Sequence, residues 1–200
     1  MTELSKSLEI IKGFVEGRVS DKELELQIES LKATLEDNSL SWTGTYVKTN
    51  PFEYLKTLQL TSILGRLNAQ GVLELFLERK GISATRFSKY SDDYNLLLNS
   101  QPNYIDADAD FIQRVIWPAG NYSKSEIKQL MKERFKELFQ FHKSYPKWIQ
   151  APEWPIKNDK PLYFMGQLEI KDCDLFHDNG SIYIFIDKET GVIESIKQLY

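Results

Sequence analysis

The chain has 200 residues, of which 42% are hydrophobic and 27% are charged, a composition typical of a folded globular protein. Its apolar runs are much shorter than the roughly 20 residues that a membrane-spanning helix needs. The net charge of -4, without a basic block, argues against nucleic acid as a partner. Glu3 and Glu9 interrupt the apolar residues at the N-terminus, so this segment does not resemble a secretory signal, and we expect a cytoplasmic protein.

The first forty residues carry the hydrophobic spacing of two amphipathic helices. The first ends near Gly17, and the second begins at Ser20, which forms a capping-box pattern with Glu23. We expect an antiparallel helical hairpin with an acidic, solvated outer face. The apolar stripes consist of Leu4, Leu8, Ile11 and Val15 in the first helix and Leu24, Ile28, Leu31 and Leu35 in the second.

The next segment begins with a polar loop over residues 38–50. Asn50 and Pro51 are typical of a helix start, and from Phe52 to Leu67 apolar residues occupy more than one side. This breadth predicts a largely buried central helix. The run VLELFLERK predicts a further helix that ends at Gly81, and a less regular helix covers about residues 84–98.

Three aspartates, at positions 106, 108 and 110, suggest a calcium loop. An EF-hand that begins at Asp106 needs Gly at position 111 and Glu at position 117, where this chain has Phe111 and Trp117. We therefore interpret the aspartates as an acidic helix start, because carboxylates stabilise the positive end of a helix.

Ser123 and Glu126 form a second capping-box pattern, at the start of a strongly amphipathic helix. The helix is predicted to run from Lys124 to about His142. The imidazole of His142 would then complement the negative end of the helix dipole. The apolar stripe consists of Ile127, Leu130, Met131, Phe135, Leu138 and Phe139.

After Pro146 the period of the apolar residues changes from 3.6 to 2, and three runs predict strands: PLYFMGQLEI, SIYIFI and VIESIKQLY. Gly166 marks a bulge or a close backbone approach, and Gly191 completes the turn of the last hairpin. Such an antiparallel meander cannot bury both faces alone, so we expect helices to cover one face.

We therefore predict a single α+β domain over residues 1–200. It combines a helical portion of about five to seven helices, residues 1–145, with a β portion, residues 146–200. Two subdomains that divide near Pro146 are the alternative.

The loop KDCDLFHDNGS, between the first two predicted strands, holds the densest cluster of polar side chains. Some of these side chains can ligate metal, and Cys173 with His177 has the chemistry of a nucleophile–base pair. However, one cysteine and two histidines do not supply a structural zinc site, and no glycine-rich elbow precedes Cys173. We interpret the segment as a solvent-exposed loop that faces a partner, and we expect no catalytic residue, metal or cofactor.

The segment PKWIQAPEWPI places Trp148 and Trp154 between prolines. Two interpretations stay open. The tryptophans pack as a rigid plug over the edge of the core, or they form an exposed aromatic anchor of the kind that dominates protein interfaces.

The series WIQAPEWP, PLYFMGQLEI and LFHDNGSIYIFIDKETGVIESIKQ resembles the C-terminal portion of bacterial polymorphic-toxin immunity proteins. The likeness covers about residues 146–200. Members of this class are cytosolic α+β proteins that lie beside toxin genes and block one cognate toxin domain. The resemblance implies a non-enzymatic binding protein that occludes such a domain, and it transfers no functional residue.

Acidic charge and this resemblance together predict a basic toxin domain as the partner. Alternative functions are a small metal-dependent or Cys/His hydrolase that uses the loop, and a scaffold whose sheet edge pairs with a second copy of itself. Neither nucleic acid nor a membrane is an expected partner, and the sequence leaves the oligomeric state open. The expected partner contacts are Asp172, Asp174, His177, Asp178, Trp148 and Trp154.

Overall fold

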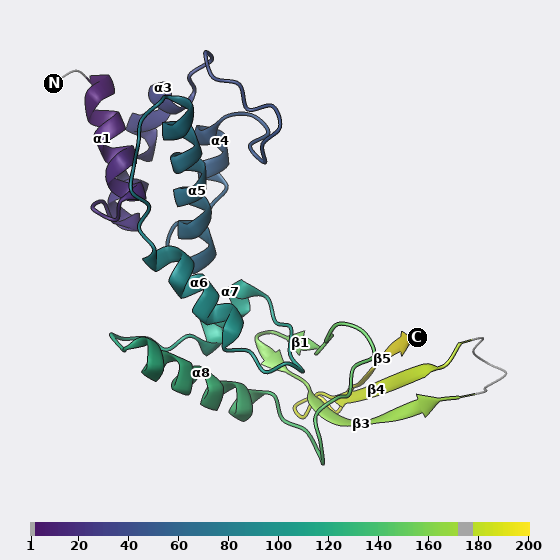
Figure 1. Cartoon of the computed structure of the whole chain (residues 1–200). Helices are drawn as coiled ribbons and strands as arrows, with labels where there is room; N and C mark the ends of the chain where they lie inside the picture. Colours follow the sequence, from purple (N-terminus) through teal and green to yellow (C-terminus); the bar gives the residue numbers. More distant parts are fainter. Residues whose placement is uncertain (1–2, 172–177) are drawn as a thin grey trace. The chain divides into compact units, whose positions relative to one another are not determined.

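The computed structural model describes residues 3–171 and 178–200, and it confirms the α+β class (Figure 1). The chain divides into two compact units, residues 1–95 (unit 1) and residues 96–200 (unit 2). The division falls within the helix α6 (Lys89–Asn99) rather than near Pro146. Unit 2 therefore combines helices with the whole β-sheet.

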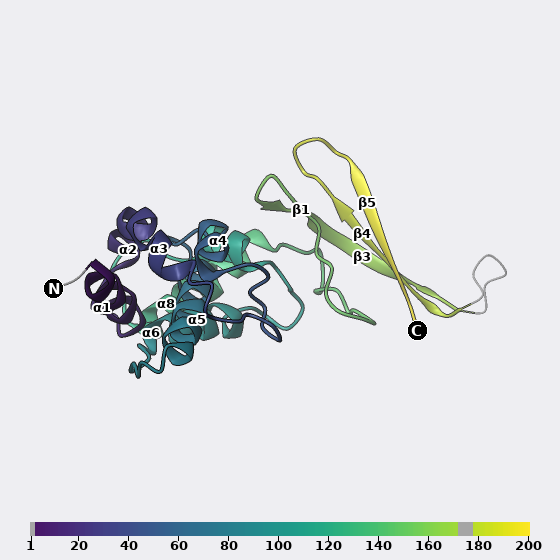
Figure 2. The same cartoon turned by 90° about the horizontal axis from the view of Figure 1, so that it is seen from above.

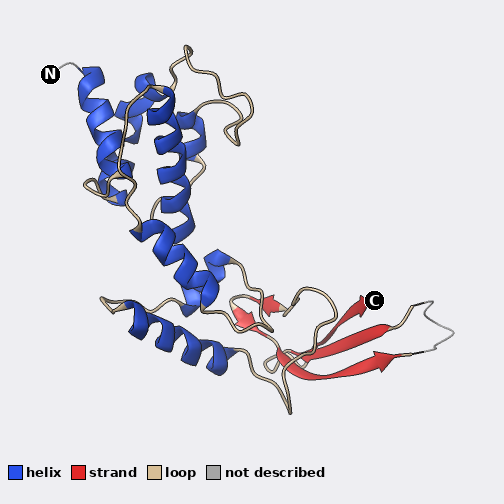
Figure 3. Ribbon diagram, viewed as in Figure 1, coloured by secondary structure: helices blue, strands red, loops and turns tan. Residues whose placement is uncertain are grey.

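Unit 1 is helical (Figure 3). Ser20 and Glu23 form the predicted capping box, and the second predicted helix is made of three consecutive helical pieces. Asn50 caps the following helix with Pro51 at its first position, also as predicted. The elements are α1 (Glu3–Val15), α2 (Asp21–Gln27), the 3₁₀-helix η1 (Ile28–Leu31), α3 (Lys32–Leu35), α4 (Pro51–Lys56) and α5 (Ile63–Arg79).

The buried amide of Gln70 ties α5 to its neighbours in unit 1. Its Nε2 donates to the backbone oxygens of Val15 and Phe87, each at 2.9 Å. Its Oε1 accepts from the guanidinium of Arg86 at 3.2 Å. The side chain is fully buried, so these bonds satisfy polar atoms that would otherwise be costly inside the core.

The predicted central helix from Phe52 to Leu67 is wrong. The chain leaves the helical path after Lys56 and begins α5 at Ile63, because the Ser62 hydroxyl accepts a hydrogen bond from the Gly65 amide at 2.8 Å. The start of α5 lies so close to the backbone of Gln59 that a Cβ on Gly65 would clash with the Gln59 carbonyl oxygen. Apolar spacing alone does not reveal this break, since Ser62 acts as a cap rather than as an interior residue.

Unit 2 contains a sheet in the order β3-β4-β5, with both pairings antiparallel, as predicted. Gly166 follows a register shift in β3, and Gly191 has a φ of 74° in the turn before β5. A two-stranded hairpin, which the sequence analysis did not anticipate, precedes the sheet. The elements are α7 (Ala109–Phe111), the π-helix η2 (Ile112–Ile116), α8 (Lys124–Leu138), β1 (Ile156–Lys157), β2 (Lys160–Pro161), β3 (Tyr163–Ile170), β4 (Gly180–Ile186) and β5 (Ile193–Leu199).

Helix α8 is shorter than predicted. It ends at Leu138, and Phe139 leaves the helical region with a ψ of 79°. The amide of His142 instead donates to the carbonyl of Phe164 in β3, at 3.0 Å. The prediction that His142 lies at the helix terminus is therefore wrong, because pairing with the sheet edge takes over the backbone groups beyond Leu138.

Two glycines of α5 provide a matched test of the close backbone approach between Gln59 and Gly65. We expect Gly65→Ala to destabilise the protein by about 1–3 kcal/mol, because the added methyl group meets backbone that cannot move aside. Gly71→Ala adds the same group next to the flexible Tyr46 hydroxyl, at 3.3 Å, and should be neutral or stabilising by up to about 1 kcal/mol. Urea unfolding followed by circular dichroism measures both changes. Equal effects of the two substitutions would contradict the close approach at Gly65.

Candidate functional site

One face of the sheet is covered by the tryptophan segment, residues 146–155, and not by helices as the sequence analysis expected. Tyr183 and Phe185 of β4 are fully buried on this face. The ring of Trp148 lies 4.4 Å from that of Tyr183, and the ring of Trp154 lies 5.5 Å from that of Phe185. Aromatic packing of this kind buries a large apolar area with few side chains.

Both indole groups are engaged inside unit 2. Trp154 is only 6% exposed, and its Nε1 donates to the carbonyl of Leu162 at 2.8 Å. The Nε1 of the half-buried Trp148 donates to the carbonyl of Tyr104 at 2.9 Å. Trp154 thus packs as the plug that the sequence analysis considered, which leaves it little surface for a partner.

Hydrogen bonds from the sheet fix the tryptophan segment in place. The Gln198 Oε1 accepts from the amides of Ile149 and Gln150, and its Nε2 donates to the carbonyl of Ala151 at 2.9 Å. The Tyr183 hydroxyl donates to the carbonyl of Lys147 at 2.9 Å, and burial raises the pKa of this phenol. Gln198 was not among the predicted site residues. The one signal for it is that a polar residue stands at a buried position of the last strand.

The opposite side of the sheet, the open face, carries a row of apolar side chains. The antiparallel register places on it Leu168 of β3, Ile182, Ile184 and Ile186 of β4, and Ile193 of β5, together with the exposed Ser195 and Lys197 of β5. The three isoleucines of β4 are half-buried. Leu168 is 59% exposed and Ile193 is 66% exposed. Figure 2 shows the three strands side by side. A solvated face of an antiparallel sheet normally carries polar residues, so an isoleucine at every second position of β4 is the unusual feature of unit 2.

The polar loop predicted to face a partner joins β3 to β4. Asp172, Cys173, Asp174 and His177 lie outside the described residues. Asp178 is described and exposed, two residues before β4 begins. Across residues 3–171 and 178–200, no group of three or more His, Cys, Asp or Glu side chains is arranged to hold a metal ion. In the earlier acidic segment, Asp108 caps α7 by accepting from the Phe111 amide at 2.7 Å, as predicted for a helix start.

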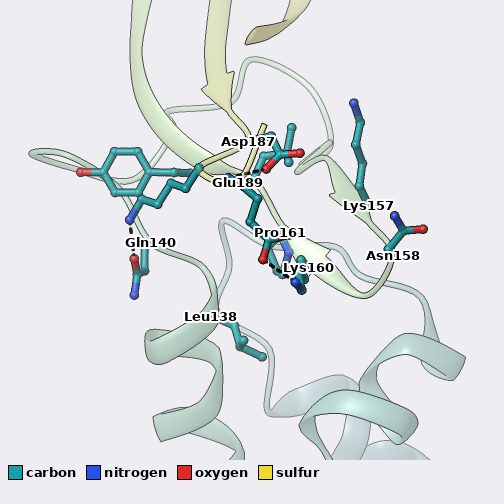
Figure 4. A pocket seen from close by; sticks show the side chains of 11 residues that line it. Leu138, Gln140, Lys157, Asn158, Lys160, Pro161, Asp187 and Glu189 are labelled. Atoms are coloured by element: carbon teal, nitrogen blue, oxygen red, sulfur yellow. Dashed lines mark hydrogen bonds and ion pairs between the residues drawn. The ribbon is translucent and has the colours of Figure 1, made fainter. Parts of the chain in front are cut away.

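The β1–β2 hairpin forms one wall of a pocket of about 250 Å³ in unit 2, shown in Figure 4. Its turn residues, Asn158 and Asp159, both have positive φ, as a two-residue hairpin turn requires. Arg114 of η2 holds the hairpin through a two-pronged ion pair with Asp159, at 2.6 and 2.9 Å. The guanidinium lowers the pKa of the Asp159 carboxyl.

The charged groups of this pocket have partners. Lys160 pairs with Glu189 at 2.5 Å, as Figure 4 shows. Lys188 donates to the Gln140 side chain at 2.8 Å, and Lys157 pairs with Glu194. The ion pair raises the pKa of Lys160, and hydrogen bonds from Thr190 and the Glu189 amide lower that of Asp187. Both shifts favour the charged forms, which is opposite to what a general acid or base needs near neutral pH. The pocket therefore offers a charge-balanced surface.

Comparisons of the chain with protein-family models, with curated proteins and with solved structures found no match. No helix within the described part of the chain has the length and apolar character needed to cross a bilayer.

The role of Trp154 as the core of unit 2 is directly testable. We expect Trp154→Ala to destabilise the protein by about 3–5 kcal/mol, because it removes a buried ring together with the hydrogen bond to Leu162. Trp42→Ala is the matched control, because Trp42 is only half-buried and lies beside Arg79 in unit 1, so its cost should be smaller. Urea unfolding measures both. A smaller loss for Trp154→Ala than for Trp42→Ala would show that the segment is not the core of this unit.

Proposed function

We propose that this chain is a non-enzymatic binding protein of the toxin-immunity type, which accepts its partner on the open face of the sheet in unit 2. The proposal is based on the row of isoleucines on one side of β4, which lies between the exposed Leu168 of β3 and Ile193 of β5. An exposed, contiguous apolar surface on a folded protein commonly marks an interaction site. Binding there removes apolar area from water at about 25 cal/mol per Å².

The size of the open face favours a different protein over a second copy of the chain. Three strands of about seven residues have a footprint of roughly 330 Å², from strand spacing and rise. Two such faces packed together would bury roughly 700 Å², well below the 1,200–2,000 Å² of a stable interface. The partner must therefore also contact what surrounds the face, including the loop between β3 and β4.

The charge of the chain and of this loop supports a basic partner. The net charge is -4, and the sequence of the loop that joins β3 to β4 includes Asp172, Asp174 and Asp178. A toxin domain of opposite charge would be steered toward such a surface, while the isoleucines supply contact area. The resemblance of residues 146–200 to immunity proteins supports the same partner class. The loop residues, including His177, then act as contacts at the rim, and Trp154 acts by holding the sheet in shape.

A charge-neutral double substitution tests the proposal. We expect Leu168→Gln with Ile193→Gln to weaken binding to the cognate toxin domain by at least about 100-fold, because each exposed apolar side chain contributes about 1.5 kcal/mol or more when buried. The toxin domain to use is the one encoded in the adjacent reading frame, and binding is measured by titration calorimetry together with rescue of growth in cells that express it.

Leu26→Gln is the control, since Leu26 is an 85% exposed leucine on α2 in unit 1. It should bind and rescue like the unchanged protein. Full binding and rescue by the double variant, with its fold intact by circular dichroism, would remove the open face from the interface. Failure of the unchanged protein to bind any toxin domain encoded beside it would reject the immunity function itself.

A further inference from the structure

A second pocket of unit 2, of about 300 Å³, is lined by positive charge. It lies between the segment that follows α8 and the bulged part of β3. Its lining residues are His142, Lys143, Ser144, Lys147, Phe164, Met165, Gly166 and Gln167, and none of them is acidic. This composition is unusual for a protein with a net charge of -4.

The backbone of this pocket is held at both ends. At one end, the amide of Phe164 donates to Gln140 and the amide of His142 donates to Phe164, each at 3.0 Å. At the other, the amide of Lys147 donates to the Gln167 Oε1 at 2.8 Å, and its carbonyl accepts from Tyr183. The basic side chains therefore extend from a backbone that is fixed before any ligand arrives, which lowers the ordering cost of binding.

The lysines here differ from those of the pocket beside β1 and β2. There, each ammonium group meets a carboxylate or an amide oxygen. Within the described residues, no carboxylate forms an ion pair with Lys143 or Lys147. Two lysines without a paired carboxylate give the pocket a positive potential, which attracts an anion.

The remaining groups supply hydrogen-bond donors. The Ser144 hydroxyl lines the pocket, and Gln167, whose Oε1 already accepts from Lys147, has its NH₂ group left to donate. Gly166 has no side chain to fill the space, and its Cα faces open space. The two lysine charges match a doubly charged anion, and lysine is a common phosphate ligand.

We propose that this pocket binds the dianion of a small phosphomonoester, with Lys143 and Lys147 as charge partners and Ser144 and Gln167 as donors. The inference goes beyond the proposed toxin binding and does not depend on it, since the pocket lies at the outer edge of β3 and the toxin would occupy the open face.

Titration of the full chain with inorganic phosphate, followed by amide signals in nuclear magnetic resonance, tests the site. We expect saturable shifts at Ser144 and Gly166 with a dissociation constant of about 1 mM or tighter. Lys143→Gln with Lys147→Gln should weaken binding by at least about 10-fold. Lys128→Gln with Lys132→Gln removes the same charge from exposed positions of α8 and should change binding by less than about 2-fold.

Three results would overturn the phosphate site: no saturable shift, shifts that map elsewhere in the chain, or equal weakening by both double variants. The last result would show that phosphate responds only to net charge. None of these results bears on binding of a toxin domain to the open face, so the two proposals fail separately.

Discussion

The contact between Trp154 and the aromatic residues of the sheet is the interaction on which unit 2 depends. Its ring lies 5.5 Å from Phe185 and 6.1 Å from Phe164 on the sheet side, and 5.3 Å from Phe139 just after α8. Phe139 in turn packs against Phe135 of α8 and Phe111 of α7. One tryptophan thus connects a three-stranded sheet, too small to be stable alone, to the helices of the same unit.

This arrangement also determines which side of the sheet remains exposed. The tryptophan segment covers the side of the sheet that carries Tyr183 and Phe185. Hydrogen bonds from Gln198 hold the segment on that side. The isoleucines of β4 then face outward. Polar residues would suit a face that only contacts water, and apolar residues on an exposed strand carry an aggregation risk. A partner that covers the face would remove this apolar area from water, which is why we propose that binding occurs on this side.

The sequence was most informative where one residue determines local structure. Ser20, Ser123 and Asn50 predicted helix starts, and Gly191 predicted a turn, because caps and positive φ depend on a few atoms. The early end of α8 was not predictable in this way, since it depends on a backbone hydrogen bond between His142 and the distant Phe164. The break before α5 is local, but it depends on Ser62 acting as a cap, which the apolar spacing does not reveal. The alternation of β4 revealed two apolar faces, but only the positions of Trp148 and Trp154 show which face is covered.

Binding at the open face is tested most directly by methyl nuclear magnetic resonance of the isoleucines while a cognate toxin domain is added. If the toxin domain binds the open face, the methyl signals of Ile182, Ile184 and Ile186 shift in proportion to complex formation, while the indole N–H signal of Trp154 stays in place. If the toxin domain saturates the protein and these three methyl signals do not move, the open face is not the binding surface and the central claim is wrong.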